Sequence, residues 1–294
     1  MTTHLPRIKA RMAIHAHRKV RGLLQGEYAS AQVGRSMDLN DLREYVRGDD
    51  VRDLDWKASA RSNQMLIKRY VATRKHVLLL VVSTGRSMAA VNDRKVPKRD
   101  LAVFVTGVLG WLAVRNGDLV SVAWGDAESA HARPASGREI RLEHGLAAVH
   151  DAIDPAGPPS DLTRLLDHVA RVVRRRTIMV VVCDEPVVDD RLVAALRRAQ
   201  AQHELLLVTI GDLDPTRETV DALSDVDTGA PLPDWARGDA KLRAEYAALL
   251  TAEARDRRTR LDRMGVPHER VVDHESAVPA IFRLLERHRH GRRR

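Results

Sequence analysis

Apolar runs alternate with amphipathic segments from residue 76 to the end of the chain. HVLLLVVS at residues 76–83 is an apolar, β-branched run with the length of a buried strand. The next segment, KRDLAVFVTGVLGWLAVRNG at residues 98–117, has the length and pattern of a helix, and Gly117 stands where a helix ends. The same pattern predicts further strands at residues 118–126, 136–145, 177–186, 203–212 and 266–274, and further helices at residues 146–153, 162–176, 189–202, 240–265 and 278–290.

This alternation predicts an α/β fold, a doubly wound and mostly parallel sheet covered by helices on both faces. We assign this sheet to residues 76–294, with a loop insertion at residues 211–237 and a basic C-terminal tail. Residues 1–75 break the rhythm and predict a basic segment followed by a small subdomain, with a short helix at residues 39–46 and a strand at residues 65–74. In a sheet of this kind, ligands bind at the carboxyl ends of the strands.

Positive charge is concentrated at the two ends of the chain. Of the net +9, residues 1–22 carry +6 and residues 283–294 carry +5, which leaves −2 for the remainder of the 294 residues. Basic ends of this kind can bind nucleic acid. However, 4 Trp, 4 Tyr and 2 Phe offer few rings on which bases could stack. Nucleic-acid binding through the basic termini therefore stays an alternative.

The expected location follows from features that the sequence lacks. No apolar run approaches the roughly 20 residues of a membrane span, and the basic start has no continuous apolar stretch. Cys183 is the single cysteine, so the chain has no internal disulfide. These features predict a soluble protein of the reducing cytoplasm.

The loop after the first strand of the sheet carries no motif of a phosphate site or a nucleophile. STGRSM at residues 83–88 contains neither G-x-G-x-x-G nor G-x-x-x-x-G-K-[ST], and Ser87 lacks the G-x-S-x-G context of a hydrolase. The 13 histidines form no H-E-x-x-H or Cys/His cluster, and the pair in HERVVDH at residues 268–274 is assigned to the polar surface. We expect no catalytic residues and no cofactor, and we interpret Cys183 as a small core residue.

Hydroxyl and carboxyl side chains at the carboxyl ends of the strands make up a candidate metal site: Ser83, Ser87, Ser160 and Asp184. Hard cations such as Mg²⁺ take oxygen ligands. This set holds a single carboxylate, which makes it a poor site for Mg²⁺ or another divalent cation, although Glu185 and Asp126 stand nearby and would add to it. The alternative role is capping and loop-closing hydrogen bonds.

A dense charged segment, REYVRGDDVRDLDWKASAR at residues 43–61, precedes the sheet. Its GDD and DLD carboxylates suggest one alternative, a Mg²⁺-dependent enzyme for phosphoryl transfer or hydrolysis. The segment also supplies five bases that can pair with these acids: Arg43, Arg47, Arg52, Lys57 and Arg61. We therefore favour a salt-bridged brace that involves Asp49, Asp50 and Asp55. Trp56 is expected to anchor this brace and to fix the small subdomain to the sheet.

The charged segment and the strand that follows it resemble the signature of the domain of unknown function 58 family, the MoxR-associated proteins with a von Willebrand factor A-like domain. The family pattern reads approximately R-x-Y-x-x-G-D-D-x-R-x-I-D-W-x-x-S-A-R, followed by a strand that ends in D-x-S-x-S-M. The matching positions are Arg43, Tyr45, Gly48, Asp49, Asp50, Arg52, Asp55, Trp56, Ser59, Ala60 and Arg61. The resemblance is best over residues 15–210.

The resemblance implies a Rossmann-type von Willebrand A domain, a metal-ion-dependent adhesion site, and work with MoxR-type AAA+ ATPases in assembling or activating client proteins. In place of the Asp, Ser and Ser of the adhesion motif, this chain has Ser83, Gly85 and Ser87. Ser160 replaces the usual threonine, and Asp184 matches the second acidic position. We therefore predict a non-enzymatic cytoplasmic adaptor with a degenerate adhesion site, whose partners are a MoxR-type AAA+ ATPase and a client protein.

Overall fold

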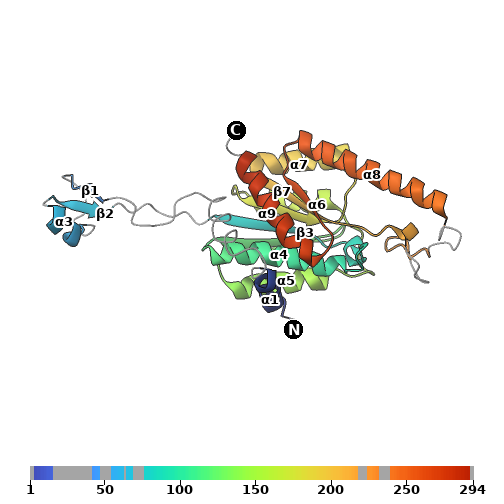
Figure 1. The fold of residues 1–294 in the computed structure, drawn as a ribbon, viewed down its shortest axis with the longest axis horizontal. Coiled ribbons are helices and arrows are strands. Elements are labelled where there is room, and N and C mark those ends of the chain that lie inside the picture. Colours follow the sequence, from blue (N-terminus) through green and yellow to red (C-terminus); the bar gives the residue numbers. More distant parts are fainter. Residues whose placement is uncertain are drawn as a thin grey trace. The chain divides into compact units, whose positions relative to one another are not determined.

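The chain divides into two units. The computed structural model describes residues 3–15, 42–46, 54–62, 64–68, 76–217, 224–231 and 239–291. Met1–Ala31 and His76–Arg294 form one compact unit, which we call the sheet unit, and Gln32–Lys75 form the small unit. Figure 1 draws both, and each is treated separately below.

The sheet unit is built on one sheet, which within the described residues consists of β3 (Val77–Ser83), β4 (Leu119–Gly125), β5 (Ala130–Ala132), β6 (Ile178–Cys183), β7 (Glu204–Ile210) and β8 (His268–Val271). The strand order is β5-β4-β3-β6-β7-β8. β5 is antiparallel to β4, and the other neighbouring strands are parallel. The chain enters at β3, builds outward to one side and then to the other, which is the doubly wound sheet that the apolar runs predict.

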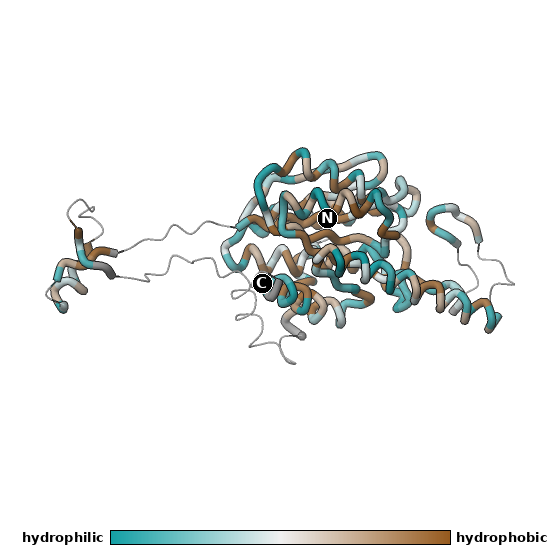
Figure 2. Tube along the Cα trace, turned by 90° about the horizontal axis from the view of Figure 1, so that it is seen from above, coloured by the Kyte–Doolittle hydropathy of each residue, from teal (hydrophilic) through white to brown (hydrophobic). Residues whose placement is uncertain are grey.

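Helices cover both faces of this sheet (Figure 1). One face carries α1 (Leu5–His15), α4 (Lys98–Arg115), α5 (Glu139–Ala152) and α9 (His274–Gly291), and the other carries α6 (Leu162–Val172), α7 (Asp190–Gln202) and α8 (Ala240–Arg263). Successive strand residues point to opposite faces. Leu78 and Leu80 of β3 therefore enter the first core, and Leu79 and Val81 enter the second. Figure 2 shows the hydrophobic stretches running along the strands inside the unit.

The N-terminal helix belongs to the sheet unit. Leu5, Ile8 and Met12 of α1 are spaced three and four residues apart, and all three are buried in the first core. The sequence predicts residues 1–75 as a single N-terminal part, whereas Met1–Ala31 group with the sheet in the structure. This apolar stripe, which is short and interrupted by basic residues, is the reason for the difference.

Most of the basic C-terminal tail is helical: α9 continues to Gly291. Arg283 Nη2 lies 3.1 Å from Glu269 Oε2, and Arg287 pairs with the other oxygen of the same carboxylate. The Glu269 side chain lies on β8 and is buried. Part of the positive charge at this end thus neutralises an acid of the sheet.

One predicted strand of the sheet unit is a helix. Residues 136–145 are predicted as an edge strand, but α5 begins at Glu139, and the edge strand is β5. Leu142, Leu146 and Val149 are buried on one side of α5 at helical spacing. The prediction is wrong because the polar residues at its start hide this stripe, whose period shows only over the whole helix.

The small unit contains a two-stranded sheet and a short helix. β1 (Leu42–Glu44) pairs antiparallel with β2 (Leu66–Lys68), and α3 (Trp56–Ser62) precedes β2 in the chain. Leu54 and Ile67 face each other across an isolated bridge and are buried. These two side chains form the apolar centre of the part of the unit that the structure describes.

The helix predicted at residues 39–46 is wrong where the structure describes it. Residues 42–44 form β1, and Val46, expected on the apolar side of a helix, is 60% exposed. Pairing with β2 satisfies the backbone of this segment and overrides the local helical pattern. The strand predicted at residues 65–74 is present in part, as β2.

Candidate functional site

The four residues of the candidate metal site come together at the carboxyl edge of the sheet. Ser83 ends β3, and Ser87 lies in the 3-10 turn η3 (Arg86–Ala89) that follows it. Ser160 lies in the loop before α6, and Asp184 directly follows β6, the parallel neighbour of β3. We call these four residues the hydroxyl cluster.

Hydrogen bonds connect the members of the hydroxyl cluster directly. The Ser87 hydroxyl donates to Asp184 Oδ2, and its oxygen lies 2.7 Å from Ser160 Oγ. The Ser83 hydroxyl donates to Ser160 Oγ at 3.4 Å. Ser83 is buried, whereas Ser87 and Ser160 are partly buried. The cluster is a chain of polar contacts from β3 through the α6 loop to β6.

Gly85 allows the Ser160 loop to approach the end of β3. A Cβ atom at position 85 would lie 2.3 Å from the Ser160 nitrogen and 2.4 Å from Ser160 Oγ, so any side chain there would displace the loop. The Arg86 N–H donates to the Pro158 carbonyl at 2.8 Å and fixes the same approach. The close approach of the two loops therefore gives a local structural reason for a glycine at position 85.

The hydroxyl cluster fits a divalent cation poorly. It offers three hydroxyls and one carboxylate, whereas Mg²⁺ in proteins usually takes carboxylates together with water in an octahedron. Each hydroxyl oxygen already has a partner within the cluster. Among the described residues, no group of three or more His, Cys, Asp or Glu side chains is arranged to hold a metal. The arrangement closes a loop by hydrogen bonds, which is the alternative role that the sequence leaves open.

Asp126, which the sequence places near this site, closes a different turn. Its Oδ1 accepts hydrogen bonds from the N–H groups of Glu128 and Ser129, each at 2.8 Å. These contacts shape the turn between β4 and β5. Its carboxylate is thereby committed to backbone amides and is not part of the hydroxyl cluster.

Glu185 also turns away from the hydroxyl cluster and joins a set of charged side chains that sequence reasoning missed. Its Oε1 lies 2.5 Å from Arg257 Nη2 on α8 and 2.8 Å from Arg270 Nε on β8. Its Oε2 accepts the N–H of Asp212 at 3.2 Å. The Asp212 carboxylate in turn pairs with Lys98, which starts α4 and is 1% exposed. We call Lys98, Glu185, Asp212, Arg257 and Arg270 the ionic cluster.

The arginines of the ionic cluster stabilise the charged form of Glu185. Burial alone would raise the pKa of this carboxyl, but the hydrogen bond and charge of Arg270, together with the charge of Arg257, outweigh burial. The pKa of Glu185 therefore lies below its ordinary value. Glu185 is ionised at neutral pH and is held by two guanidinium groups.

Cys183 is buried inside β6, as the sequence predicts for a small core residue. Burial raises the pKa of its thiol well above the ordinary value, and the charge of Asp184 acts in the same direction. The thiol is protonated at neutral pH and has little nucleophilic character.

The signature segment contributes local structure to the small unit. Asp55 stands before α3, and its Oδ1 accepts the N–H groups of Lys57 and Ala58 at 3.1 Å each, which is the contact of a helix N-cap. The Ser59 hydroxyl oxygen accepts the Leu66 N–H at 2.8 Å and joins α3 to β2. These two matching positions therefore cap and fasten the helix.

The expected brace is described only in part. Trp56 is 67% exposed within the small unit, and its expected anchoring of the brace to the sheet stays a prediction. Tyr45, directly after β1, is half-buried, and Arg61 is exposed at the end of α3. Arg43 lies in β1. The remaining acids and bases of the brace, together with Gly48 of the signature, lie outside the described residues: Arg47, Asp49, Asp50 and Arg52.

The sequence profile of a family described as "Protein of unknown function DUF58" matches residues 41–257, which contain the signature, the hydroxyl cluster and part of the ionic cluster. The chain belongs to the DUF58 family. Proteins similar to this chain include the uncharacterized protein Rv1480 of Mycobacterium tuberculosis, which is 26% identical over 285 residues. That match covers 93% of this chain and 86% of the relative.

Solved structures with a similar fold include the protein BatB from Bacteroides thetaiotaomicron, with a TM-score of 0.45, 17% identity, and coverage of 72% of this chain and 98% of that one. An aerotolerance-related membrane protein from Bacteroides fragilis gives a TM-score of 0.43, 16% identity, and coverage of 72% and 99%. A von Willebrand factor type A protein from Catenulispora acidiphila gives 0.39, 14%, and coverage of 74% and 43%. These likenesses concern the fold alone.

The prediction of a cytoplasmic location is wrong. It rested on the lack of an apolar span, yet the structures of similar fold include a protein described as a membrane protein. Within the described residues, none of the helices combines the length and the apolar character needed to span a bilayer.

Proposed function

We propose that this DUF58 protein is a non-enzymatic adaptor that works with a MoxR-type AAA+ ATPase in the assembly or activation of a client protein. Membership of the DUF58 family supports this proposal, and the signature segment resembles that of MoxR-associated proteins. The observation that carries it is the exposed apolar surface of the small unit, the part of the chain that holds the signature.

Three apolar side chains are exposed on connected segments of the small unit. Trp56 is 67% exposed, Val46 60% and Met65 58%. Backbone hydrogen bonds connect the three segments. The Tyr45 N–H donates to the Met65 carbonyl at 2.8 Å, and the Asp55 N–H donates to the Leu66 carbonyl at 2.9 Å. Exposed tryptophan is enriched among the residues that dominate protein interfaces. A unit with a small apolar centre and this much exposed apolar surface is suited to contact a partner.

The side chains that an enzyme would use are already engaged in hydrogen bonds, which supports an enzyme less than an adaptor. The Asp55 carboxylate, the one acid of the GDD and DLD motifs that the structure describes, is hydrogen-bonded to two amides at the start of α3. The hydroxyl cluster satisfies its own hydrogen bonds, and Ser87 has no histidine partner among the described residues. Nucleic-acid binding by the C-terminal arginines is also less favoured, since Arg283 and Arg287 share the carboxylate of Glu269.

Co-purification of the full chain with the MoxR-type ATPase encoded nearest to its gene tests the proposal. We expect association in one nucleotide state, with a non-hydrolysable ATP analogue or with ADP, and a loss of at least about tenfold in affinity for Trp56→Ala. Ile140→Ala is the matched control, because Ile140 is an exposed apolar residue of α5 in the sheet unit. No association in either nucleotide state, or equal losses for both variants, would contradict the proposal.

A further inference from the structure

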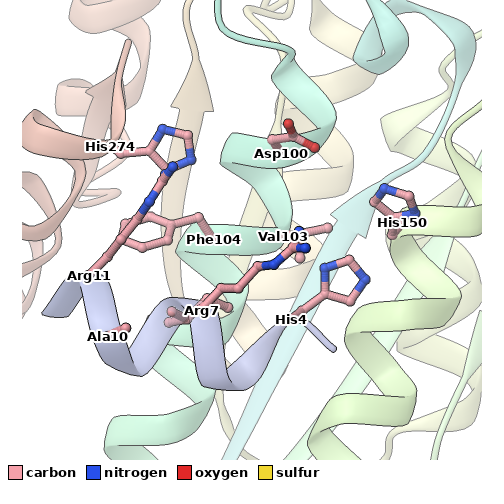
Figure 3. Close-up of a pocket in the computed structure, with 10 residues that line it drawn as sticks. His4, Arg7, Ala10, Arg11, Asp100, Val103, Phe104, His150 and His274 are labelled. Carbon is pink, nitrogen blue, oxygen red and sulfur yellow. The ribbon is translucent and has the colours of Figure 1, made fainter. Parts of the chain in front are cut away.

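A cavity of about 480 Å³ lies among α1, α4, α5 and α9 on one face of the sheet unit (Figure 3). Its volume falls within the range of roughly 300–1,000 Å³ that is typical of small-molecule sites. Its polar lining consists of His4, Arg7, Arg11, Asp100, His150 and His274. We call it the cationic cavity.

The periodicity of α1 explains why basic side chains reach this cavity. The apolar stripe of the helix faces the core, and His4, Arg7 and Arg11 repeat the same spacing of three and four on the neighbouring side. The Glu143 carboxylate of α5 accepts the N–H groups of His4 and Leu5 at 2.6 and 2.7 Å. This contact fixes the start of α1 against α5 and so holds the basic side in place.

Positive charge exceeds negative charge in the cationic cavity. Figure 3 shows Arg7 reaching into the space between Asp100 and His4, while Arg11 extends toward His274. Asp100 is the single carboxylate of the lining and is exposed. Residues of α4, α5 and α9 border the cavity beside α1. Arg7 forms no ion pair with any of their side chains or with any other residue that the structure describes. The residues that line the cavity therefore hold two guanidinium groups against one carboxylate, while the carboxylates of Glu143 and Asp151 act on His4, and that of Asp273 on His274, from beside the lining.

Three imidazole rings and a phenyl ring complete the lining. The rings of His4 and His150 lie 4.9 Å apart, and His274 meets Phe104 edge to face at 5.0 Å. Burial lowers the pKa of both His4 and His274, with a further contribution from His150 for the first and from Arg11 for the second. His4 and His274 are therefore neutral at pH 7, and they offer hydrogen-bonding nitrogens and flat surfaces without adding charge.

We propose that the cationic cavity binds a small organic anion, whose phosphate or carboxylate group contacts Arg7 and Arg11 and whose flat ring packs against Phe104 and His274. Guanidinium groups match the geometry of both oxyanions. The volume suits one charged group together with one ring. The site belongs to the sheet unit alone and is independent of the adaptor role proposed above.

Isothermal titration calorimetry of the full chain with four probes tests this proposal: inorganic phosphate, phenyl phosphate, benzoate and phenol. We expect saturable binding of phenyl phosphate or benzoate, tighter than that of inorganic phosphate, and no binding of phenol. The comparison of phenyl phosphate with benzoate separates phosphate from carboxylate. Arg7→Gln should weaken binding of the preferred anion by about tenfold or more, as expected for the loss of charge-assisted hydrogen bonds. Arg7→Lys should recover part of the affinity, because it keeps the charge.

Arg255→Gln on α8 is the matched control. It removes the same charge from an exposed position on the opposite face of the sheet and should leave the affinity unchanged. Arg7 is also exposed, so each variant is expected to fold, and its thermal unfolding is recorded beside the titration. The proposal is overturned if neither ring-bearing anion binds with saturation, or if Arg7→Gln and Arg255→Gln bind them equally well.

Discussion

Asp184 and Glu185 are consecutive acids at the end of β6, yet they belong to two different clusters. Asp184 accepts a hydrogen bond from the neutral hydroxyl of Ser87, while Glu185 is held between Arg257 and Arg270. In the hydroxyl cluster one carboxylate meets three hydroxyls. In the ionic cluster three cations meet two carboxylates. The edge of the sheet where an adhesion-type site would lie thus uses hydrogen bonds at its centre and ion pairs beside it.

The comparison predicts that the ionic cluster contributes more to stability than the hydroxyl cluster. Glu185 and Arg257 are 14% and 15% exposed, so their charges are largely removed from water. Replacing Glu185 with Ala leaves two guanidinium groups without their shared carboxylate. We expect the free energy of unfolding, measured with urea, to fall by about 3 kcal/mol, as for other buried pairs that lose one partner.

The control for this prediction is Glu245→Ala on α8. Glu245 lies 3.9 Å from Lys241 in an exposed pair, and its loss should cost less than about 1 kcal/mol. Equal decreases in the free energy of unfolding for the two variants would show that the buried ion pairs stabilise the protein no more than an exposed pair does. The contrast between the two clusters would then have no energetic basis.

The same cluster predicts how stability depends on pH. The folded-state pKa of Glu185 is below the value of about 4.5 that applies in the unfolded chain. Its contribution is therefore fully present above pH 4.5 and is lost as the pH falls through the lower, folded pKa. We expect the difference in unfolding free energy between the wild type and Glu185→Gln to be constant from pH 7 to pH 5. Below pH 4.5 the difference should shrink.

Urea unfolding of both proteins at pH 7, 5, 4 and 3.5 checks this dependence. Glutamine does not titrate, so subtracting the two curves removes the contributions of the other acids of the chain. A difference that grows as the pH falls would mean that the arginines do not stabilise the carboxylate. That result would contradict the arrangement described for the ionic cluster.

The sheet could be predicted from the sequence because its information is local. Each buried strand is a continuous apolar run, such as residues 76–83, and each cap or stop lies beside its helix. Asp161, for example, stands directly before α6, accepts the Arg164 N–H at 2.9 Å and caps the helix. Elements whose stability comes from distant partners were misjudged. β1 depends on β2, and α5 shows its stripe only over its full length.

The candidate site could likewise be predicted where its information is local and not where it depends on distant partners. Parallel strands place their carboxyl ends together, which is why Ser83 and Asp184 could be assigned to one edge from their positions alone. The partners of Glu185 lie 72 and 85 residues away, on elements with many other arginines. No local signal selects Arg257 and Arg270 from among them. The cationic cavity was missed for a similar reason, since His274 was assigned to the polar surface although it starts α9 and faces α1 and α4.

The smallest expected effect concerns the hydroxyl cluster. Ser87→Ala removes the hydroxyl that donates to Asp184 and contacts Ser160, but both partners are close to solvent, and water can replace part of the loss. We expect a decrease of about 1 kcal/mol in the free energy of unfolding. Thr251→Ala, which removes an exposed hydroxyl on α8, should change the free energy of unfolding by less than about 0.5 kcal/mol.

Magnesium chloride at constant ionic strength should leave the melting temperature of the wild type unchanged, because a cation that binds the folded state must stabilise it. A saturable rise with Mg²⁺ that Ser87→Ala abolishes would show instead that the cluster holds a cation.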